Sequence, residues 1–183
     1  MRTDARRNYE RILRTAVEHF AAYGVDTSLD DIARDAGVGP GTLYRHFPTR
    51  EDLLAAALQD RQTQLLARKN ELEKGVDPAD ALREWLRELR HHLRAFKGLA
   101  DPMLGAVKGK AAPLTLTCQS MESITGDFLR RAQAADRART DVSARDLFLS
   151  ALALAWIEDC AEDGAASIGS LEEMIAFGYR APA

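Results

Sequence analysis

The feature that most constrains this chain is the segment formed by residues 28–53, which reads SLDDIARDAGVGPGTLYRHFPTREDL. Apolar residues such as Ile32 recur there at helical spacing until Gly37, a residue that tolerates the left-handed backbone that ends many helices. A second helix is predicted over residues 39–47, because proline is accepted in a first turn and Pro48 prevents continuation. The pattern therefore predicts two short helices joined by a tight turn.

Two capping signals border this pair of helices. Ser28 can cap the first helix with Asp31 three residues later, and Thr49 can cap the helix that follows with Asp52 at the same spacing. The two signals predict well-defined helix starts on either side of the turn.

The second short helix has two unlike faces. At about 100° per residue, Leu43 and Phe47 fall together and are expected to face the core. Gly41, Thr42 and Arg45 then lie on the opposite face, which is small, polar and cationic. Such a face fits a DNA major groove, because arginine pairs with guanine acceptors and glycine permits close approach.

Further contacts are expected with phosphates. Tyr44 and His46 flank the outer face, and Arg50 lies beside the free N–H groups that open the next helix. The first turns of the chain add a group of arginines, of which Arg6 is the predicted DNA contact, although the chain as a whole carries a net charge of −3. We expect this cationic arm to contact phosphates or a minor groove, the alternative being a solvated, mobile N-terminus.

The residues IARDAGVGPGTLYRHFPTREDLL closely resemble the helix-turn-helix signature of the TetR family of bacterial transcriptional regulators. The resemblance implies that Thr42, Tyr44, His46 and Arg50 occupy positions that commonly contact DNA, together with Ser28. The segments FKGLADPML and RAQAADRARTDVSARDL are also similar to the SbtR-like subgroup of that family.

One pair of residues departs from the family pattern. Gly39 and Pro40 stand where many members carry serine and a basic residue, so a hydroxyl cap and a phosphate contact are missing. The complete set of predicted DNA contacts is Ser28, Pro40, Gly41, Thr42, Tyr44, Arg45, His46, Arg50 and Arg6.

The rest of the chain also has helical periodicity. We predict an all-α fold of about nine helices, with a three-helix DNA-binding domain over residues 1–48 and a helical effector-binding and dimerisation domain over residues 49–183. The expected helices cover residues 9–23, 28–36, 39–47, 49–72, 77–96, 103–107, 113–135, 143–163 and 169–179.

The last two expected helices are the predicted dimer interface. The segment of residues 143–163 is apolar on all sides, so it should be buried on more than one side. Two such helix pairs from two chains would form a four-helix bundle, and a two-fold dimer would match a palindromic operator. The alternative is an ordinary monomer core.

A mainly apolar effector pocket is expected among the middle helices. The alternative for each candidate side chain is that it fills the core and does not line a pocket. The candidates are Trp85, Leu89, His92, Phe96, Met103, Leu104, Cys118, Met121, Phe128 and Trp156.

Several other kinds of site are not indicated. Cys118 and Cys160 are far apart and fit neither a disulfide framework nor a zinc finger, which favours a reducing compartment. The segment GAVKGKA at residues 105–111 lacks the spacing and hydroxyl of a phosphate loop. The adjacent His91 and His92 point to different helix faces, and the acidic helix end that includes Glu158 is expected to be solvated rather than metal-binding.

The sequence thus predicts a cytoplasmic, non-enzymatic regulator without metal or cofactor. Its expected partners are a double-stranded DNA operator, a small-molecule effector and a second copy of the chain; no apolar run is long enough to cross a membrane. The leading interpretation is a repressor that an effector releases from DNA. Two alternatives stay open: a DNA-binding protein of this fold without a small-molecule effector, and an all-helical enzyme or carrier.

Overall fold

The computed structural model describes residues 2–74, 77–109, 112–160 and 168–181. The all-α expectation is confirmed, and these residues form nine helices. They are α1 (Arg2–Tyr23), α2 (Leu29–Asp35), α3 (Pro40–His46), α4 (Arg50–Leu72), α5 (Pro78–Leu93), α6 (Ala100–Val107), α7 (Ala112–Ala134), α8 (Ala144–Cys160) and α9 (Ile168–Tyr179).

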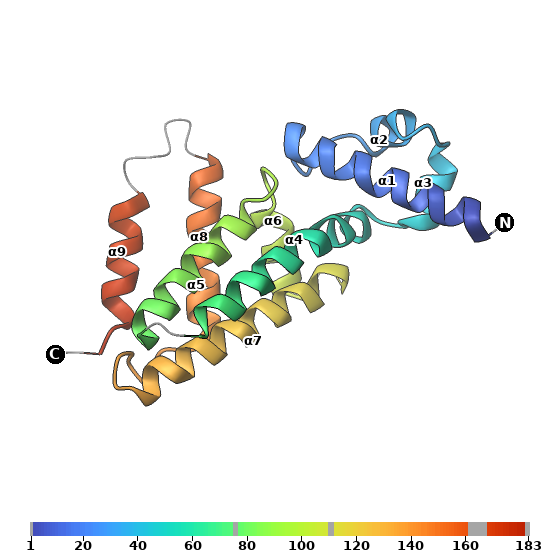
Figure 1. Cartoon of the computed structure of the whole chain (residues 1–183). Helices are drawn as coiled ribbons and strands as arrows, with labels where there is room; N and C mark the ends of the chain where they lie inside the picture. The colour runs from blue at the N-terminus through green and yellow to red at the C-terminus, as the bar shows by residue number, and fades with distance from the viewer. Residues whose placement is uncertain (1, 75–76, 110–111, 161–167, 182–183) are drawn as a thin grey trace.

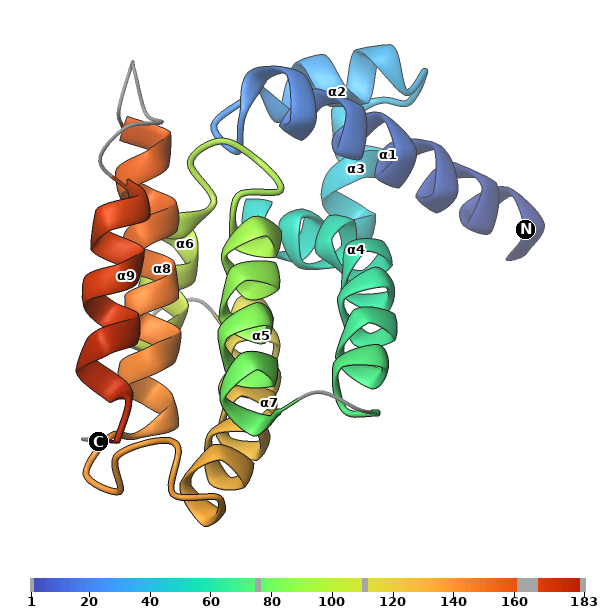
Figure 2. The same cartoon turned by 60° about the vertical axis from the view of Figure 1, so that its left-hand side comes forward.

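The helices form a small head and a larger body. Figures 1 and 2 show α1, α2 and α3 grouped at one end, with α4 leading from them into the bundle of α5 to α9. Helix α5 packs against α4, α7 and α8, while α1 packs on α4 and α8 packs on α9. Helix α4 therefore belongs to both groups and carries the head on the body.

The N-terminal arginines lie on a helix. Helix α1 begins at Arg2, about two turns before the predicted start at Tyr9. Arg6 pairs with Glu10 at 3.3 Å, and Arg7 lies 4.0 Å from Asp4, so pairs on one helix face support these first turns. The contact of these arginines with phosphates or a minor groove stays a prediction, and the mobile N-terminus that was its alternative is helical here.

The core of the body is organised around Trp85 of α5. Its ring stacks on Phe128 of α7 with centroids 5.3 Å apart and planes 16° from parallel. The indole Nε1 donates to Thr125 Oγ1 at 2.9 Å, and that hydroxyl donates to the Met121 carbonyl at 2.8 Å. The buried indole N–H and the buried hydroxyl are therefore both paired, and these contacts fix α5 against α7.

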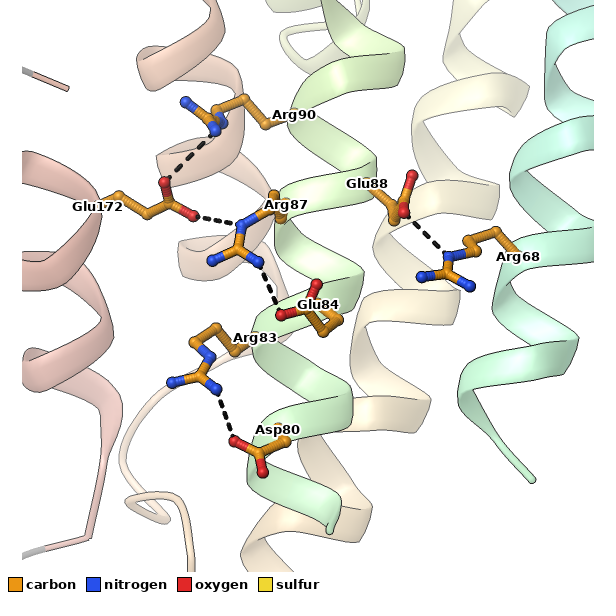
Figure 3. A network of polar contacts seen from close by, with 8 residues as sticks. All are labelled: Arg68, Asp80, Arg83, Glu84, Arg87, Glu88, Arg90 and Glu172. Carbon is orange, nitrogen blue, oxygen red and sulfur yellow. Dashed lines mark hydrogen bonds and ion pairs between the residues drawn. The ribbon is translucent and has the colours of Figure 1, made fainter. Parts of the chain in front are cut away.

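The opposite side of α5 carries charged side chains. Figure 3 shows Arg68 of α4 joined to Glu88, and Arg87 and Arg90 joined to Glu172 of α9. Helix α5 is amphipathic in the ordinary sense, with an apolar face in the core and a polar face that links its neighbours.

The sequence indicated that the acidic end of α8 is solvated, but the structure shows it paired with other groups. Glu158 pairs with Arg90 at 2.9 Å and with Arg94 at 3.3 Å, and Asp159 accepts a hydrogen bond from the Gly98 N–H at 2.9 Å. The expectation failed because the sequence does not show that the C-terminal end of α5 lies beside the end of α8. The neighbouring Glu162 and Asp163 lie outside the described residues.

Helices α8 and α9 leave large apolar side chains uncovered. One side of α8 is buried, but Trp156 is 48% exposed on the other, and Met174 and Phe177 of α9 are 69% and 80% exposed. None of the described helices combines the length and the apolar character needed to cross a membrane.

Candidate nucleic-acid interface

The turn between α2 and α3 is built as its residues predict. Ser28 Oγ accepts a hydrogen bond from the Asp31 N–H at 3.3 Å, which caps α2. Gly37 adopts φ = +65°, the left-handed conformation that a side chain disfavours, and the Val38 N–H donates to the Ala33 carbonyl at 2.9 Å. These bonds end α2 and turn the chain directly into α3.

Helix α3 is anchored on one side and open on the other. Leu43 and Phe47 are 1% and 3% exposed, which confirms their predicted place in the core. Gly41 and Arg45 are exposed on the opposite face, with Thr42 half-buried beside them. The face predicted to enter a major groove is therefore available to an external partner.

The start of α3 lacks a side-chain cap. Gly39 is the N-cap residue and makes no side-chain hydrogen bond, while Pro40 occupies the first turn and is exposed. Proline has no N–H there to satisfy. Gly39 and Pro40, in place of the serine and basic residue of many family members, therefore cost the helix little stability.

The two flanking side chains are held to different degrees. His46 is half-buried and meets the ring of Tyr9 edge-on, with centroids 6.1 Å apart. Tyr9 also stacks on Phe47 at 4.9 Å, so α1 fixes this end of α3. Tyr44 is 46% exposed and makes no ring contact within the described residues.

Arg50 has a structural role that the sequence did not indicate. Its Nη1 donates two hydrogen bonds of 2.6 Å, to the carbonyl oxygens of Val25 and Thr27. These bonds tie the start of α4 to the loop before α2. A phosphate contact at Arg50 stays a prediction. It would use the rest of the guanidinium or the main-chain N–H groups at the start of α4. Thr49 and Asp52 form the predicted capping box there.

Positive charge on the head is local. Arg45 of α3 and Arg14 of α1 are exposed, and neither has a carboxylate within ion-pair distance in the described part of the chain. Arg11 instead donates to Asn8 at 2.9 Å and to the Gly37 carbonyl at 3.4 Å, so it braces the turn. The uncompensated cations agree with a site for phosphate groups.

The head is connected to the body at the loop after α1. Gly24 has φ = +85°, and the Val25 N–H donates to the Lys97 carbonyl at 2.9 Å. Beside this bond, the rings of Phe20 and Phe96 lie 5.5 Å apart. The loop between α5 and α6 is therefore in direct contact with the head.

The ten predicted effector-pocket residues do not gather around one cavity. Eight are buried, whereas Leu104 and Trp156 are 38% and 48% exposed and line a separate hollow of about 330 Å³ between α6 and α8. Cys118 lies 3.7 Å from the Met103 carbonyl, and burial raises the pKa of its thiol to about 11, so it is an inert core group. The ligand-binding role of the set stays a prediction.

His92 differs from the other buried candidates. It lines a cavity of about 170 Å³ between α4 and α5, next to Arg61, a residue that the sequence did not single out. Burial, and secondarily the Arg61 charge, lower the pKa of His92 to about 4. No cluster of metal-binding side chains occurs within the described ranges.

Two family models match the chain over separate segments. Residues 12–57 match the bacterial regulatory proteins of the tetR family, and residues 77–181 match the C-terminal domain of SbtR-like transcriptional regulators. The second segment alone covers more than half of the chain.

Known relatives agree with both matches. The chain is 32% identical over 126 residues to the HTH-type transcriptional regulator UidR of Escherichia coli, covering 63% of this chain and 64% of that relative. Among solved structures, a TetR transcriptional regulator of Streptomyces coelicolor, SCO0520, is 34% identical with a TM-score of 0.64, covering 96% and 99% of the two chains. A TetR regulatory protein of Mycobacterium vanbaalenii is 30% identical with a TM-score of 0.54, covering 98% of each chain.

Proposed function

The chain belongs to the tetR family of bacterial regulatory proteins and is a DNA-binding transcriptional regulator, and we propose that it is a repressor that binds a palindromic operator as a dimer and leaves it when a small molecule binds. The head of residues 1–48 would read DNA, and residues 49–183 would bind the effector and the second copy. Such a protein acts where the bacterial chromosome lies, so its proposed location is the cytoplasm.

The observation that carries the proposal is the contrast between the two faces of α3. Leu43 and Phe47 hold the helix on the head, while Gly41 and Arg45 stand free on the outside. In a helix-turn-helix protein the second helix lies in the major groove, where an arginine gives the most common specific contact, to guanine O6 and N7. Arg45 is accordingly the proposed base-reading residue, with Thr42 beside it.

The remaining predicted contacts would position the head. Tyr44 and His46 lie on α3 beside its outer face, Ser28 caps α2, and Arg6 lies on the N-terminal turns of α1. Contacts of this kind fix the orientation on DNA without reading sequence.

The second copy is proposed to pack on α8 and α9. Trp156, Met174 and Phe177 are large apolar side chains left exposed on these neighbouring helices. Burying them against the same residues of another copy gives a two-fold interface, and a two-fold protein matches a two-fold operator.

Release would follow from a change in the spacing of the two heads. An effector that prefers a body conformation with wrongly spaced heads lowers DNA affinity by population shift. Moving the protein from almost entirely the DNA-binding conformation to almost entirely the other requires the effector to bind the second conformation about 5.5 kcal/mol more tightly. The bond between Val25 and Lys97 and the long helix α4 offer the mechanical connection.

The test is selection of bound sequences from random DNA with the purified full chain. A palindromic consensus, with half-sites separated by about one helical turn or a multiple of it, is the expected result. Recovery of no enriched sequence at low salt would contradict the proposal, and an enriched sequence that no metabolite releases would favour a regulator without a small-molecule effector.

A further inference from the structure

The cavity of about 170 Å³ between α4 and α5 is unlike the apolar core beside it. Its lining includes Arg61, Gln64 and Arg68 of α4 and Glu88, His91 and His92 of α5. Arg68 is paired with two carboxylates, Glu88 at 3.0 Å and Glu71, which is not part of the lining, at 2.8 Å. With both histidines neutral, the remaining formal charge of the lining is the single positive charge of Arg61.

Two groups in this lining have no ion-pair or hydrogen-bond partner among the described residues, the buried ring of His92 and the exposed guanidinium of Arg61. His92 is only 7% exposed, and its buried Nε2 atom has no hydrogen-bond partner. An unpaired buried polar atom is costly, and in native proteins it commonly marks a place for a water or a ligand. Arg61 makes no ion pair in the described part of the chain; its guanidinium lies instead over the ring of Phe96, 5.7 Å from the centroid.

We propose that this cavity binds a small organic monoanion, with its carboxylate held by Arg61 and hydrogen-bonded to His92. The volume equals that of about five or six water molecules in the liquid, which is enough for a small organic acid. A carboxylate would supply the charge that Arg61 lacks and the acceptor that an N–H at Nε2 requires. Leu65, which also lines the cavity, offers apolar contact to the rest of the ligand.

The position of the cavity connects it to the head. Phe96, which Arg61 covers, lies 5.5 Å from Phe20 of α1, and Lys97 follows it in the chain and accepts the hydrogen bond from Val25. An anion that draws Arg61 from the ring of Phe96 would alter the packing at this junction. The consequence for DNA rests on the proposed function, whereas the binding of the anion does not.

The binding test is isothermal titration calorimetry of the full chain with benzoate, butyrate and inorganic phosphate. Benzamide and butyramide serve as neutral controls of the same shape. The carboxylates are expected to bind and the amides not, and uptake of protons near pH 6 is expected because an adjacent anion raises the pKa of His92. Equal binding of benzoate and benzamide, or binding of none of the probes, would overturn the proposal, and binding of phosphate alone would replace the organic acid by an inorganic anion.

Variants separate this site from general attraction of anions. Arg61→Gln is expected to weaken benzoate binding roughly 10- to 100-fold, as the loss of a charge-assisted hydrogen bond does, and His92→Phe to abolish the proton uptake. Arg130→Gln, at an exposed residue that pairs with Asp127 on α7, is the matched control and should bind as the unaltered chain does. Unchanged affinity in Arg61→Gln would reject the assignment.

A DNA-release measurement is kept separate from the binding measurement. Benzoate that binds to the chain without weakening its complex with the selected operator would leave the anion site standing and remove its regulatory role. Failure of operator selection itself would count against the proposed function and not against the site.

Discussion

The main-chain N–H of Val25 donates to the carbonyl oxygen of Lys97 across 2.9 Å, which joins the loop that precedes the DNA-reading helices to the loop between α5 and α6. The Lys97 side of this junction is itself held by α8, because the next residue, Gly98, donates its N–H to Asp159. A chain of hydrogen bonds therefore runs from the proposed dimer helices to the head. Bonds to the main chain hold these loops more rigidly than contacts between exposed side chains would.

Gly24→Ala is expected to loosen this junction. A Cβ atom at residue 24 would lie 2.9 Å from the Lys97 carbonyl oxygen, and φ = +85° is strained for alanine. We expect a loss of about 1 to 3 kcal/mol in the free energy of unfolding, measured by urea denaturation. Gly105→Ala is the control, because its Cβ would meet nothing within 4 Å; equal stability of the two variants would show that the junction is not tightly packed.

Arg45→Ala is expected to relax the sequence preference of the head. Arg45 is exposed on α3 and makes no ion pair within the described residues, so its loss should leave the fold intact. Operator binding should weaken by about 1 to 3 kcal/mol, with the preference lost at one base pair of each half-site. Arg14→Ala, on α1, should instead weaken all sequences alike. A variant at Arg45 that keeps the full consensus would remove this residue from base reading.

The two short helices and the caps around them were predictable because their signals are local. Glycine at a left-handed position, proline in a first turn and a Thr49–Asp52 capping box act within a few residues. The role of Arg50 was not predictable, since its acceptors at Val25 and Thr27 lie 25 and 23 residues away in the sequence. The same reason explains the missed ion pair between Glu158 and Arg90.

The effector residues show a second limit of sequence. Large apolar side chains on the middle helices look alike whether they fill a core or line a cavity. Trp85 and Phe128 stack on each other, whereas Trp156 lies at the surface. Arg61 escaped notice because an exposed arginine on a polar helix face has no sequence signal, and only the fold brings it beside His92.

Phe177→Glu is expected to separate the proposed dimer. The side chain is 80% exposed on α9, so a charge there costs the isolated chain little, whereas two charges buried at a two-fold interface are strongly unfavourable. Sedimentation should show a dimer for the unaltered chain and a monomer for the variant. Leu116→Glu, at an equally open apolar side chain of α7 that is 73% exposed, should remain dimeric. A dimer unaffected by Phe177→Glu would place the interface elsewhere.

Acid should destabilise the chain through His92. Because its pKa is about 4 in the folded chain against 6.5 when unfolded, the unfolded chain binds more protons between these values. The stabilising contribution of the neutral ring is therefore complete above pH 6.5 and is lost as the pH falls toward 4, and a shift of this size corresponds to about 3 kcal/mol. Denaturation curves from pH 7 to pH 4 should show a flatter decline for His92→Phe than for the unaltered chain, since phenylalanine keeps the burial without the titration. His91→Phe, at the exposed neighbour, should leave the decline unchanged; parallel curves for all three chains would mean that His92 is solvated or paired when folded.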